Sequence, residues 1–563
     1  MRIKSVKIKN FRTLENIEFS IFDVKNCLVL FGKNNTGKSN IFHALDVFFS
    51  NSADKAPIES FKNPTNEIEI IIRFSDLSVE ERVLHENNAI GGDIIIRQII
   101  RPPTSGRGGG RRINYSAARS SGAEEIDQNE YPIIFEGVNH AAFWVDNPFG
   151  ASNVFEGYLP RFFYLPAIDN IGDHLSLKKN QRVGELIADI IDRIAGTDPS
   201  ITQIKNGLAA LNSIQAINDF NNKVSNYLSE LFPNSQFKLA IGEPDFLKVL
   251  ELAHSFTSTD HAETHPALKG EGMQRAIIFA ILREYSELIR SRLVASTTVR
   301  SLVFAIEEPE LFMHPQMQES FKTILSQICA NTDQVLFSTH SAYLIDIQNR
   351  RNYLRVAKKD DGCTEILQLS DIYINYQSVF NGDPSKEEFD LELLINPSVS
   401  RMFFADNVLL VEGEDDESLL TPLIQREKAS SQGQKITSLI RAGGKGNLAT
   451  LCVLLNEYAI PYLVIYDQDG NSNSGQKIEQ VKAQKSVGDT YSAAPCLDEE
   501  IKNHLPNSQS NLTNYFRQES KSYNGQQVRI WKFSGKFAAY KVGSAITISD
   551  LPTNLQTKLR ALI

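Results

Sequence analysis

The sequence predicts an α/β protein of several domains, with two chemically different sites far apart along the chain. Three observations support this prediction. First, 563 residues are too many for one hydrophobic core, so we expect two to four domains. Second, a glycine-rich segment, Gly32–Ser39, lies between an apolar strand and a helix. Third, acidic residues from Glu412 to Asp469 follow two apolar strands near the other end of the chain.

The composition is that of a globular protein in a reducing compartment. Apolar residues make up 42% of the chain and charged residues 22%. No apolar run reaches the roughly 18 residues of a transmembrane helix, and residues 1–9 lack the apolar block of a signal peptide. The five cysteines include no CxxC pair, which argues against a zinc site and a disulfide framework and predicts a cytoplasmic protein. The net charge of −10 argues against a passive nucleic-acid coat, but it does not exclude a nuclease, because metal-binding carboxylates add negative charge.

Residues 1–170 are expected to form the first lobe of an α/β domain. Apolar residues that alternate or run together predict strands at residues 3–8, 17–21, 27–31, 67–74, 93–100 and 162–167. A helix is predicted from Ser39 to about Phe49, because apolar residues at helical spacing share one face. Residues 102–112 are rich in glycine and arginine, and two interpretations stay open: a loop that contacts DNA, or a solvated hairpin tip.

Residues 171–262 are predicted to be a helical insertion. Between about 175 and 235 apolar residues recur at helical spacing, which fits either core packing or dimerisation. Strand and helix alternate again in residues 263–390, the second lobe of the first domain. A further α/β unit starts near Phe403, and the polar stretch before it places a boundary between 375 and 400, so the last domain is taken as residues 391–563.

The segment Gly32–Ser39 has the GxxxxGKS pattern of a phosphate-binding loop, and it stands between a strand and a helix as that loop requires. Glycines let backbone N–H groups wrap the phosphates, and the helix N-terminus adds positive potential. Lys38 is expected to reach the β- and γ-phosphates of ATP, and Ser39 to bind Mg²⁺. The predicted nucleotide contacts in this loop are Gly32, Asn35, Gly37, Lys38 and Ser39.

An apolar strand that ends in two carboxylates, within Ser301–Glu310, has the Walker B arrangement. Glu307 would act on the Mg²⁺ shell, and Glu308 would polarise the water that attacks the γ-phosphate. A later strand ends in His340, and a glycine segment, Lys269–Arg275, precedes a helix upstream of the Walker B strand.

These four elements, in this order, resemble the ABC-type ATPase heads of the SMC and RecF group, as does the opening segment Ile8–Arg12. The resemblance implies that His340 senses the γ-phosphate, and that Gly270 and Gly272 complete the ATP site of a second copy in a homodimer. The segment reads Lys-Gly-Glu-Gly rather than Leu-Ser-Gly-Gly, so slow turnover is expected. Gln98 is the candidate for the Q-loop glutamine. No long heptad repeat is present, so a true SMC arm is excluded.

The late acidic residues form a candidate metal site. One buried strand delivers Glu412 into a glycine turn, and Asp416 follows in the next helix, where Asp415 could take its place. A second buried strand ends in Asp467 and Asp469. Carboxylates at the ends of neighbouring parallel strands can converge, and hard oxygen ligands suit Mg²⁺ or Mn²⁺. With two metal ions, one would activate water while the other stabilises the leaving oxygen.

This pair of strands resembles the TOPRIM fold, whose glutamate and DxD aspartates bind metal. An ABC-type head followed by a TOPRIM domain resembles the OLD (overcoming lysogenization defect) nucleases, a family that includes the Gabija defence nuclease. The resemblance covers nearly the whole chain. It implies a catalytic role for Asp498, with Glu499 as the next choice. It also implies a lysine that stabilises the scissile phosphate, for which Lys536 is the first choice and Lys541 the alternate.

The predicted architecture is therefore an ABC/SMC-like P-loop ATPase head with an inserted helical dimerisation region, followed by a C-terminal TOPRIM domain. The expected function is an ATP-regulated, metal-dependent DNA endonuclease or nickase, and the resemblance alone adds a role in anti-phage defence. The expected ligands are ATP with one Mg²⁺, a pair of Mg²⁺ or Mn²⁺ ions in the TOPRIM site, and double-stranded DNA. The resemblance also implies a homodimer or higher homo-oligomer and a co-encoded defence partner, either a helicase-like protein or a reverse transcriptase with its nucleic-acid product.

Two other classes of function stay open. The first is a nucleotide-switched clamp that acts in repair or recombination without cutting DNA, against which the near-complete acidic set argues. The second is a primase- or topoisomerase-like enzyme, since the TOPRIM fold serves those enzymes too. The lack of a recognisable cleavage module with a tyrosine nucleophile argues against it.

Overall fold

The computed structural model places most of the chain in two compact units. The first unit comprises Met1–Phe162, Arg300–Glu310 and Pro315–Ile563, and the second comprises Phe163–Val299 and Leu311–His314. The structure describes residues 1–50, 52–103, 113–148, 159–167, 203, 215–231, 236, 257–259, 263–291, 301–330, 333–345, 350–369, 376, 394–430, 435–468, 473–485, 487–523 and 526–563. The basic segment predicted at 102–112 lies almost entirely outside these residues.

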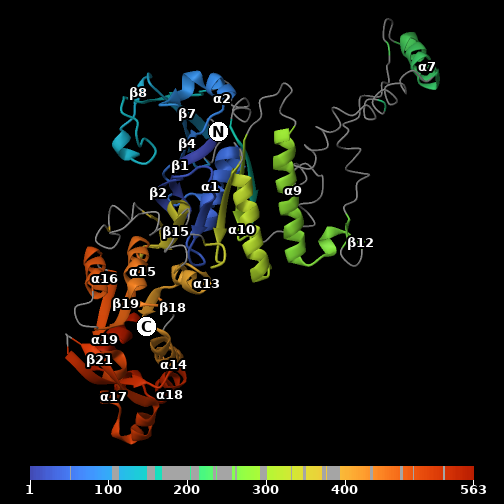
Figure 1. Ribbon diagram of the computed structural model, residues 1–563. Coiled ribbons are helices and arrows are strands. Elements are labelled where there is room, and N and C mark those ends of the chain that lie inside the picture. The colour runs from blue at the N-terminus through green and yellow to red at the C-terminus, as the bar shows by residue number, and fades with distance from the viewer. Residues whose placement is uncertain are drawn as a thin grey trace. The chain divides into compact units, whose positions relative to one another are not determined.

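An antiparallel sheet forms the N-terminal part of the first unit, drawn in blue in Figure 1. Its strands follow the order β2-β1-β4-β6-β7-β9-β8, and β5 pairs with β6. The strands predicted at 67–74 and 93–100 are confirmed as β4 and β6, isoleucine-rich strands buried along almost their whole length. The bounds are β1 Arg2–Phe11, β2 Leu14–Ser20, β4 Ile68–Ser75, β5 Ala89–Ile90, β6 Asp93–Ile100, β7 Ile113–Arg119, β8 Glu124–Glu125 and β9 Phe143–Asp146.

A second sheet carries the nucleotide motifs. Its order is β10-β13-β14-β3-β15-β16, and β13, β14, β3 and β15 run parallel to one another. Because parallel strands end at the same edge, the segments after β3, β13 and β14 share one edge of this sheet. The bounds are β3 Leu28–Phe31, β10 Arg161–Leu165, β13 Leu302–Glu307, β14 Gln334–Thr339, β15 Tyr353–Lys358 and β16 Thr364–Gln368, with α1 Lys38–Ser50 and α10 Pro315–Ala330 among the helices.

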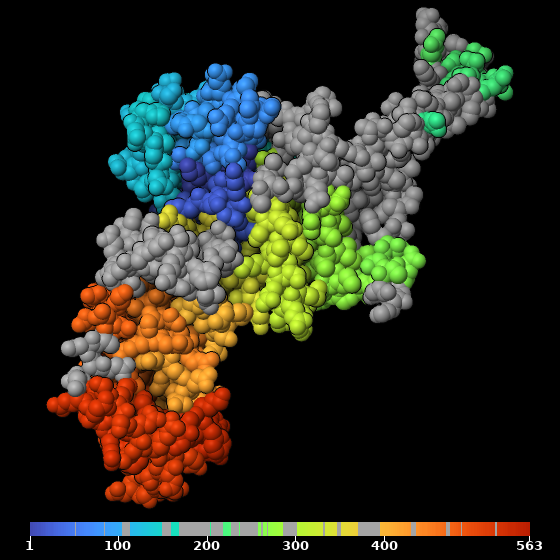
Figure 2. Space-filling model, in the orientation of Figure 1, coloured from blue at the N-terminus to red at the C-terminus, as the bar shows by residue number. Residues whose placement is uncertain are grey.

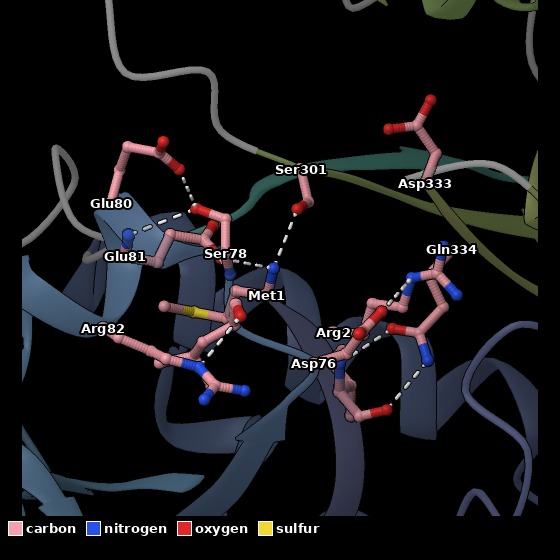
Figure 3. Close-up of polar contacts among 12 residues, drawn as sticks. Met1, Arg2, Asp76, Ser78, Glu80, Glu81, Arg82, Ser301, Asp333 and Gln334 are labelled. Atoms are coloured by element: carbon pink, nitrogen blue, oxygen red, sulfur yellow. Dashed lines mark hydrogen bonds and ion pairs between the residues drawn. The ribbon is translucent and has the colours of Figure 1, made fainter. Parts of the chain in front are cut away.

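Polar side chains fix the start of the chain between the two sheets (Figure 3). The side-chain amide of Gln334 accepts a hydrogen bond from the Ile3 N–H and donates one to the Ile3 carbonyl, both at 2.8 Å. The amino group of Met1 pairs with Glu81 at 2.7 Å and donates to Ser301 at 3.0 Å. Glu81 also closes the capping box of α2 (Val79–Leu84) with Ser78. These contacts hold β1 against the first residue of β14.

The second unit is described only in part. Its described elements are α7 Gln215–Leu231, the hairpin of β11 Ser258–Thr259 and β12 Glu263–Thr264, and α9 Glu271–Ser291. Within the helical insertion predicted for residues 171–262, the one long described segment is the helix α7, and residues 258–259 form the short strand β11. Residues 203, 236 and 257 are also described, and the rest of the predicted insertion lies outside the described residues. In the described part of the chain, no helix is long and apolar enough to cross a membrane.

Residues 403–563, coloured orange and red in Figures 1 and 2, contain a parallel sheet of order β18-β17-β19-β20 and a separate antiparallel pair, β21 and β22. Helices cover the parallel sheet, and the core joins the strands to α14, α17, α18 and α19. The alternation of strand and helix expected here is thereby confirmed. The bounds are β17 Asn407–Val411, α14 Glu414–Ser430, β18 Thr437–Arg441, α15 Lys445–Glu457, β19 Tyr462–Asp467, α16 Asn473–Gln484, β20 Gly488–Ala493, α17 Leu497–His504, β21 Phe516–Tyr523, β22 Gln526–Phe533, α18 Lys536–Ala545 and α19 Thr553–Leu562.

Candidate nucleotide and metal sites

The loop between β3 and α1 has a backbone that only glycine can follow at two positions. Gly32 has φ +142°, and a Cβ there would lie 2.2 Å from the Val356 carbonyl oxygen. Gly37 has φ +107°, and a Cβ would lie 2.2 Å from the Thr364 hydroxyl. That hydroxyl donates to the Thr36 carbonyl at 2.8 Å, so β16 holds the loop in place. The geometry matches the expectation for a phosphate-binding loop.

Lys38 is folded back over this loop. Its side chain is buried, and its ammonium donates to the carbonyls of Gly32 at 3.1 Å and Lys33 at 2.6 Å. Burial lowers the pKa of Lys38 to about 8, although the nearby carboxylates Glu308 and Glu307 act in the opposite direction. A bound triphosphate would replace the carbonyl partners. Ser39 follows in the first turn of α1, exposed to solvent.

The Walker B and switch residues meet at the same edge of the sheet. Glu307 ends β13, and the backbone N–H of Glu308 donates to the Ser338 carbonyl at 3.0 Å. The His340 imidazole Nε2 lies 3.4 Å from a Glu308 carboxylate oxygen. Burial and the charge of Lys38 lower the pKa of His340 to about 4, so the imidazole is neutral at physiological pH. A neutral imidazole beside Glu308 can orient the water that attacks a γ-phosphate.

Glu310 is a residue of this site whose part sequence reasoning missed. Its buried carboxylate accepts hydrogen bonds from the Thr339 hydroxyl at 2.8 Å and from the His340 N–H at 2.7 Å. Burial raises the pKa of Glu310, and these two hydrogen bonds oppose the shift. Glu310 therefore fixes the backbone that presents His340. In the sequence, Glu310 was visible as the third carboxylate of Glu-Glu-Pro-Glu. Its hydrogen-bond partners, Thr339 and His340, lie at the end of another strand, so the local sequence did not reveal them.

Three further residues were predicted to act at a nucleotide site: Gln98, Gly270 and Gly272. Gln98 is fully buried on β6, where its side chain donates to Tyr115 at 2.5 Å and to the Phe48 carbonyl in the last turn of α1. It stands at the opposite end of α1 from Lys38, so the Q-loop role proposed for it has no support in the described structure. Gly270 and Gly272 flank the first residue of α9 in the second unit.

The C-terminal domain brings the predicted metal ligand Asp467 together with Asp498, which was predicted as a catalytic residue. Asp467 ends β19, and one of its carboxylate oxygens accepts a hydrogen bond from the Leu497 N–H at 2.9 Å. Asp498 is buried in the first turn of α17, where it accepts from the Phe533 N–H at 3.0 Å. Potential ligand atoms of Asp467, Asp498 and Cys496 lie within 4.8 Å of one another. Burial raises the pKa of the Cys496 thiol to about 11, so it stays protonated beside the two carboxylates.

Asp416, in the first turn of α14, joins this group. Glu412 directly follows β17, which pairs in parallel with β19. Asp416 accepts a hydrogen bond from the Gly413 N–H at 3.0 Å, and burial together with Asp467 and Asp498 raises its pKa to about 7. Several carboxylates in a buried space repel one another. A divalent cation would remove this repulsion, because carboxylate oxygens are the ligands that such a cation prefers. The arrangement therefore fits Mg²⁺ or Mn²⁺.

The lysine in this group is Lys532, which sequence reasoning missed. Its ammonium lies 2.9 Å from an Asp467 oxygen and 2.7 Å from an Asp498 oxygen. Burial acts to lower the pKa of Lys532, but the two carboxylates outweigh it and raise that pKa. Lys536 lies at the start of α18 with its side chain 71% exposed, 3.9 Å from Glu414. The sequence offered one sign of the role of Lys532: it is a lysine in the partly buried strand β22, next to Phe533.

The structure also describes Glu499 and Asp415, two further candidates at this site. Glu499 accepts from the Trp531 N–H at 2.5 Å, so its carboxylate braces β22 while that of Asp498 faces Asp467. Burial and Asp498 raise the pKa of Asp415, which puts this residue near the same carboxylates. Asp469 lies outside the described residues.

The phosphate-binding loop contacts the C-terminal domain within the first unit. Phe31, the residue before Gly32, packs edge-on against Phe403 at 5.6 Å and Tyr458 at 5.0 Å between ring centroids. Lys33 forms an ion pair with Asp406, which directly precedes β17. The nucleotide loop, through Lys33, and the residue just before it, Phe31, therefore contact the domain that holds the acidic site.

The fold and the sites together define a P-loop ATPase joined to an α/β domain with a cluster of buried carboxylates. A family model described as an AAA ATPase domain matches residues 1–345, more than half of the sequence, and the chain belongs to that family. A second model, the TOPRIM domain of overcoming lysogenization defect-like proteins, matches residues 403–469. The predicted order of an ATPase domain followed by an OLD-like TOPRIM domain is thereby confirmed.

Known proteins match over most of the chain. The Old nuclease of Escherichia phage P2 is 23% identical over 488 residues, which cover 84% of this chain and 78% of the relative. Endonuclease GajA of Bacillus cereus strain VD045 is 23% identical over 505 residues, 85% of this chain and 76% of the relative. A solved Smc head bound to the C-winged helix domain of ScpA covers 66% of this chain and 98% of its own, with 14% identity and a TM-score of 0.37. The two enzymes support a nuclease with an ATPase domain.

Proposed function

We propose that this protein is a DNA endonuclease whose cleavage of phosphodiester bonds is controlled by ATP. The observation that carries the proposal is the group of carboxylates around Lys532 at the carboxyl edge of the C-terminal parallel sheet. The names of the nuclease relatives and the TOPRIM match support the same activity. The role in anti-phage defence rests only on the resemblance to the OLD nucleases.

The residues assigned to hold a pair of Mg²⁺ or Mn²⁺ ions are Glu412, Asp416, Asp467 and Asp469. When bound, such ions would supply an activated water and charge stabilisation for the leaving oxygen. In the reaction the water oxygen bonds to phosphorus, the bond from phosphorus to one sugar oxygen breaks, and that oxygen takes up a proton. Lys532 keeps Asp467 and Asp498 together, so both carboxylates stay aimed at the site. Lys536 is assigned to a phosphate of the DNA backbone.

ATP with Mg²⁺ is assigned to the loop that contains Lys38 and Ser39, with Glu307 and Glu308 at the γ-phosphate end. The control of cleavage would pass through Phe31 and Lys33, because these residues flank Gly32 and contact the C-terminal domain. A nucleotide that moves the loop would thereby move the start of β17, which leads to Glu412. The plasmid assay with and without ATP decides whether ATP activates or inhibits cleavage.

We also infer a homodimer in which Gly270 and Gly272 of one copy complete the ATP site of the other. The support is the resemblance of Lys269–Arg275 to the signature of ABC-type heads. Sedimentation of the full chain with and without ATP tests it, beside Lys38→Ala. An ATP-dependent dimer that the variant fails to form is expected, and an ATP-independent monomer would contradict the inference.

The activity is tested with purified full chain and supercoiled plasmid, with Mg²⁺ or Mn²⁺ and with or without ATP. Nicked or linear plasmid is expected with metal, and none with EDTA. Asp467→Ala and Lys532→Ala are expected to abolish cutting, while Glu499→Gln should retain it because Glu499 braces β22 outside the carboxylate group. Absence of cutting under every metal condition would refute the nuclease, and binding without cutting would favour a clamp.

A further inference from the structure

In helix α18 the small side chains are buried and the large aromatic side chains are exposed, which is the reverse of the usual distribution. Its small residues, Ala538, Ala539, Val542 and Gly543, face the core, whereas Phe537 is 66% exposed and Tyr540 is 49% exposed. At 3.6 residues per turn, Lys536, Phe537, Tyr540 and Lys541 share one side of the helix. Two large aromatic side chains on a solvated face forgo the free energy that burial would provide. We call this set of four residues the α18 face.

The α18 face is fixed beside the carboxylates. A Cβ on Gly543 would lie 2.0 Å from the Leu419 carbonyl oxygen, so α18 and α14 approach more closely than any other residue allows. At the same C-terminal end of α18, the Arg426 guanidinium of α14 donates to the carbonyls of Ser544 and Ile546. The first turn of α14 carries Asp416, so this packing sets the distance from the α18 face to the metal site.

Charge on the α18 face suits a polyanion. Lys536 and Lys541 flank the two aromatic rings, and the Lys541 ammonium lies 5.3 Å from the centre of the Phe537 ring. Lys536 reaches 3.9 Å from Glu414, two residues before Asp416 on α14. Lysines interleaved with aromatic rings are the pattern that binds phosphates and stacks bases of a single strand. A fully paired duplex offers no base faces to such rings, because its bases are stacked on one another.

We propose that the α18 face binds an unpaired segment of the DNA substrate next to the cleaved phosphate, with bases stacked on Phe537 and Tyr540. The lysines then contact the phosphates of the same strand. This inference rests on the proposed nuclease function and names its substrate class: DNA with unpaired bases, such as a bubble, a flap or a frayed end. The continuity of the α18 face with the metal site favours a nucleic acid over a protein partner.

Binding to the full chain in EDTA tests the inference without any cleavage. Fluorescence anisotropy would compare a short fully paired duplex with the same duplex carrying a central unpaired segment. The wild-type chain is expected to prefer the bubble, by roughly fivefold to a hundredfold for each base that stacks. Phe537→Ala with Tyr540→Ala should remove this preference, and Phe537→Tyr should keep it because the ring remains. Lys541→Ala should lower the salt dependence of binding by about one ion.

Phe22→Ala is the matched control, since Phe22 is as exposed as Tyr540 but lies in the N-terminal domain. Equal wild-type affinity for both DNAs, or an unchanged preference in the double alanine variant, would overturn the inference. Loss of preference in Phe22→Ala would overturn it as well, because the effect would then not belong to the α18 face. These outcomes are independent of the plasmid assay, so failure of the nuclease proposal is seen separately as a lack of cutting by the wild-type chain.

Discussion

Removal of the Lys532 charge should destabilise the metal-free protein and make its stability depend on added metal. The ammonium bridges Asp467 at 2.9 Å and Asp498 at 2.7 Å, and its side chain is only 23% exposed. At an effective dielectric constant of about 20, each contact is worth roughly 6 kcal/mol of Coulomb energy, most of which desolvation offsets. Removal of one partner of a buried pair typically costs about 3–5 kcal/mol, because the remaining charges stay buried.

Lys532→Met keeps an unbranched, apolar side chain that is one atom shorter, and it removes the charge. We expect the variant to lose about 3 kcal/mol of unfolding free energy in EDTA, and to regain more stability than wild type when Mn²⁺ is added, because the ion takes over neutralisation of the carboxylates. Chemical denaturation followed by tryptophan fluorescence measures both, since Trp531 is the neighbour of Lys532 in β22. A variant as stable as wild type in EDTA would refute the reasoning. Lys536→Met, whose side chain is exposed, is the control and should change stability little.

Three further predictions concern the ATPase part and its contact with the acidic domain. ATP affinity should fall as pH rises through about 8, by up to about tenfold for each pH unit, because the lowered pKa of Lys38 means that its ammonium is lost there; constant affinity up to pH 10 in binding calorimetry would contradict this. Gln334→Ala should lower the unfolding free energy by about 2–4 kcal/mol, since the N–H and carbonyl of Ile3 lose their buried partners, whereas exposed Gln316→Ala should have little effect. Asp406→Asn removes the ion pair with Lys33 and should shrink the effect of ATP on plasmid cutting by roughly 2- to 30-fold, while cutting without ATP is retained. An undiminished ATP effect in that variant would show that control takes another route.

The strands and the loop between β3 and α1 could be predicted because their signals are local. The strands at residues 67–74 and 93–100 follow from their runs of isoleucine, and the helix after Ser39 follows from apolar spacing. The glycine pattern around Lys38 requires a particular backbone, so it specifies the loop without knowledge of distant neighbours. The order of an ATPase domain followed by a TOPRIM domain could also be predicted, because short local motifs mark each domain.

The described structure gives the Q-loop role of Gln98 no support, because its side chain donates to the Phe48 carbonyl at the end of α1. A glutamine in a strand carries no local sign of which end of a helix it contacts. Glu310 was visible as a carboxylate, but its function depends on Thr339 and His340 of another strand. The choice of Asp498 over Glu499 came from the resemblance and stays a prediction. In the structure Asp498 lies beside Asp467, whereas Glu499 accepts a hydrogen bond from the Trp531 backbone.

The sequence by itself determined the two sites, the residue types that they need and their order along the chain. Only the tertiary structure decided that Lys532, rather than Lys536, stands between the carboxylates, and that Phe31 and Lys33 join the nucleotide loop to the C-terminal domain. The physical reason is distance along the chain: local patterns fix strands, turns and helices, because their hydrogen bonds are between near neighbours. Side chains hundreds of residues apart meet only through packing of whole sheets, and no local pattern encodes which partner each of them meets.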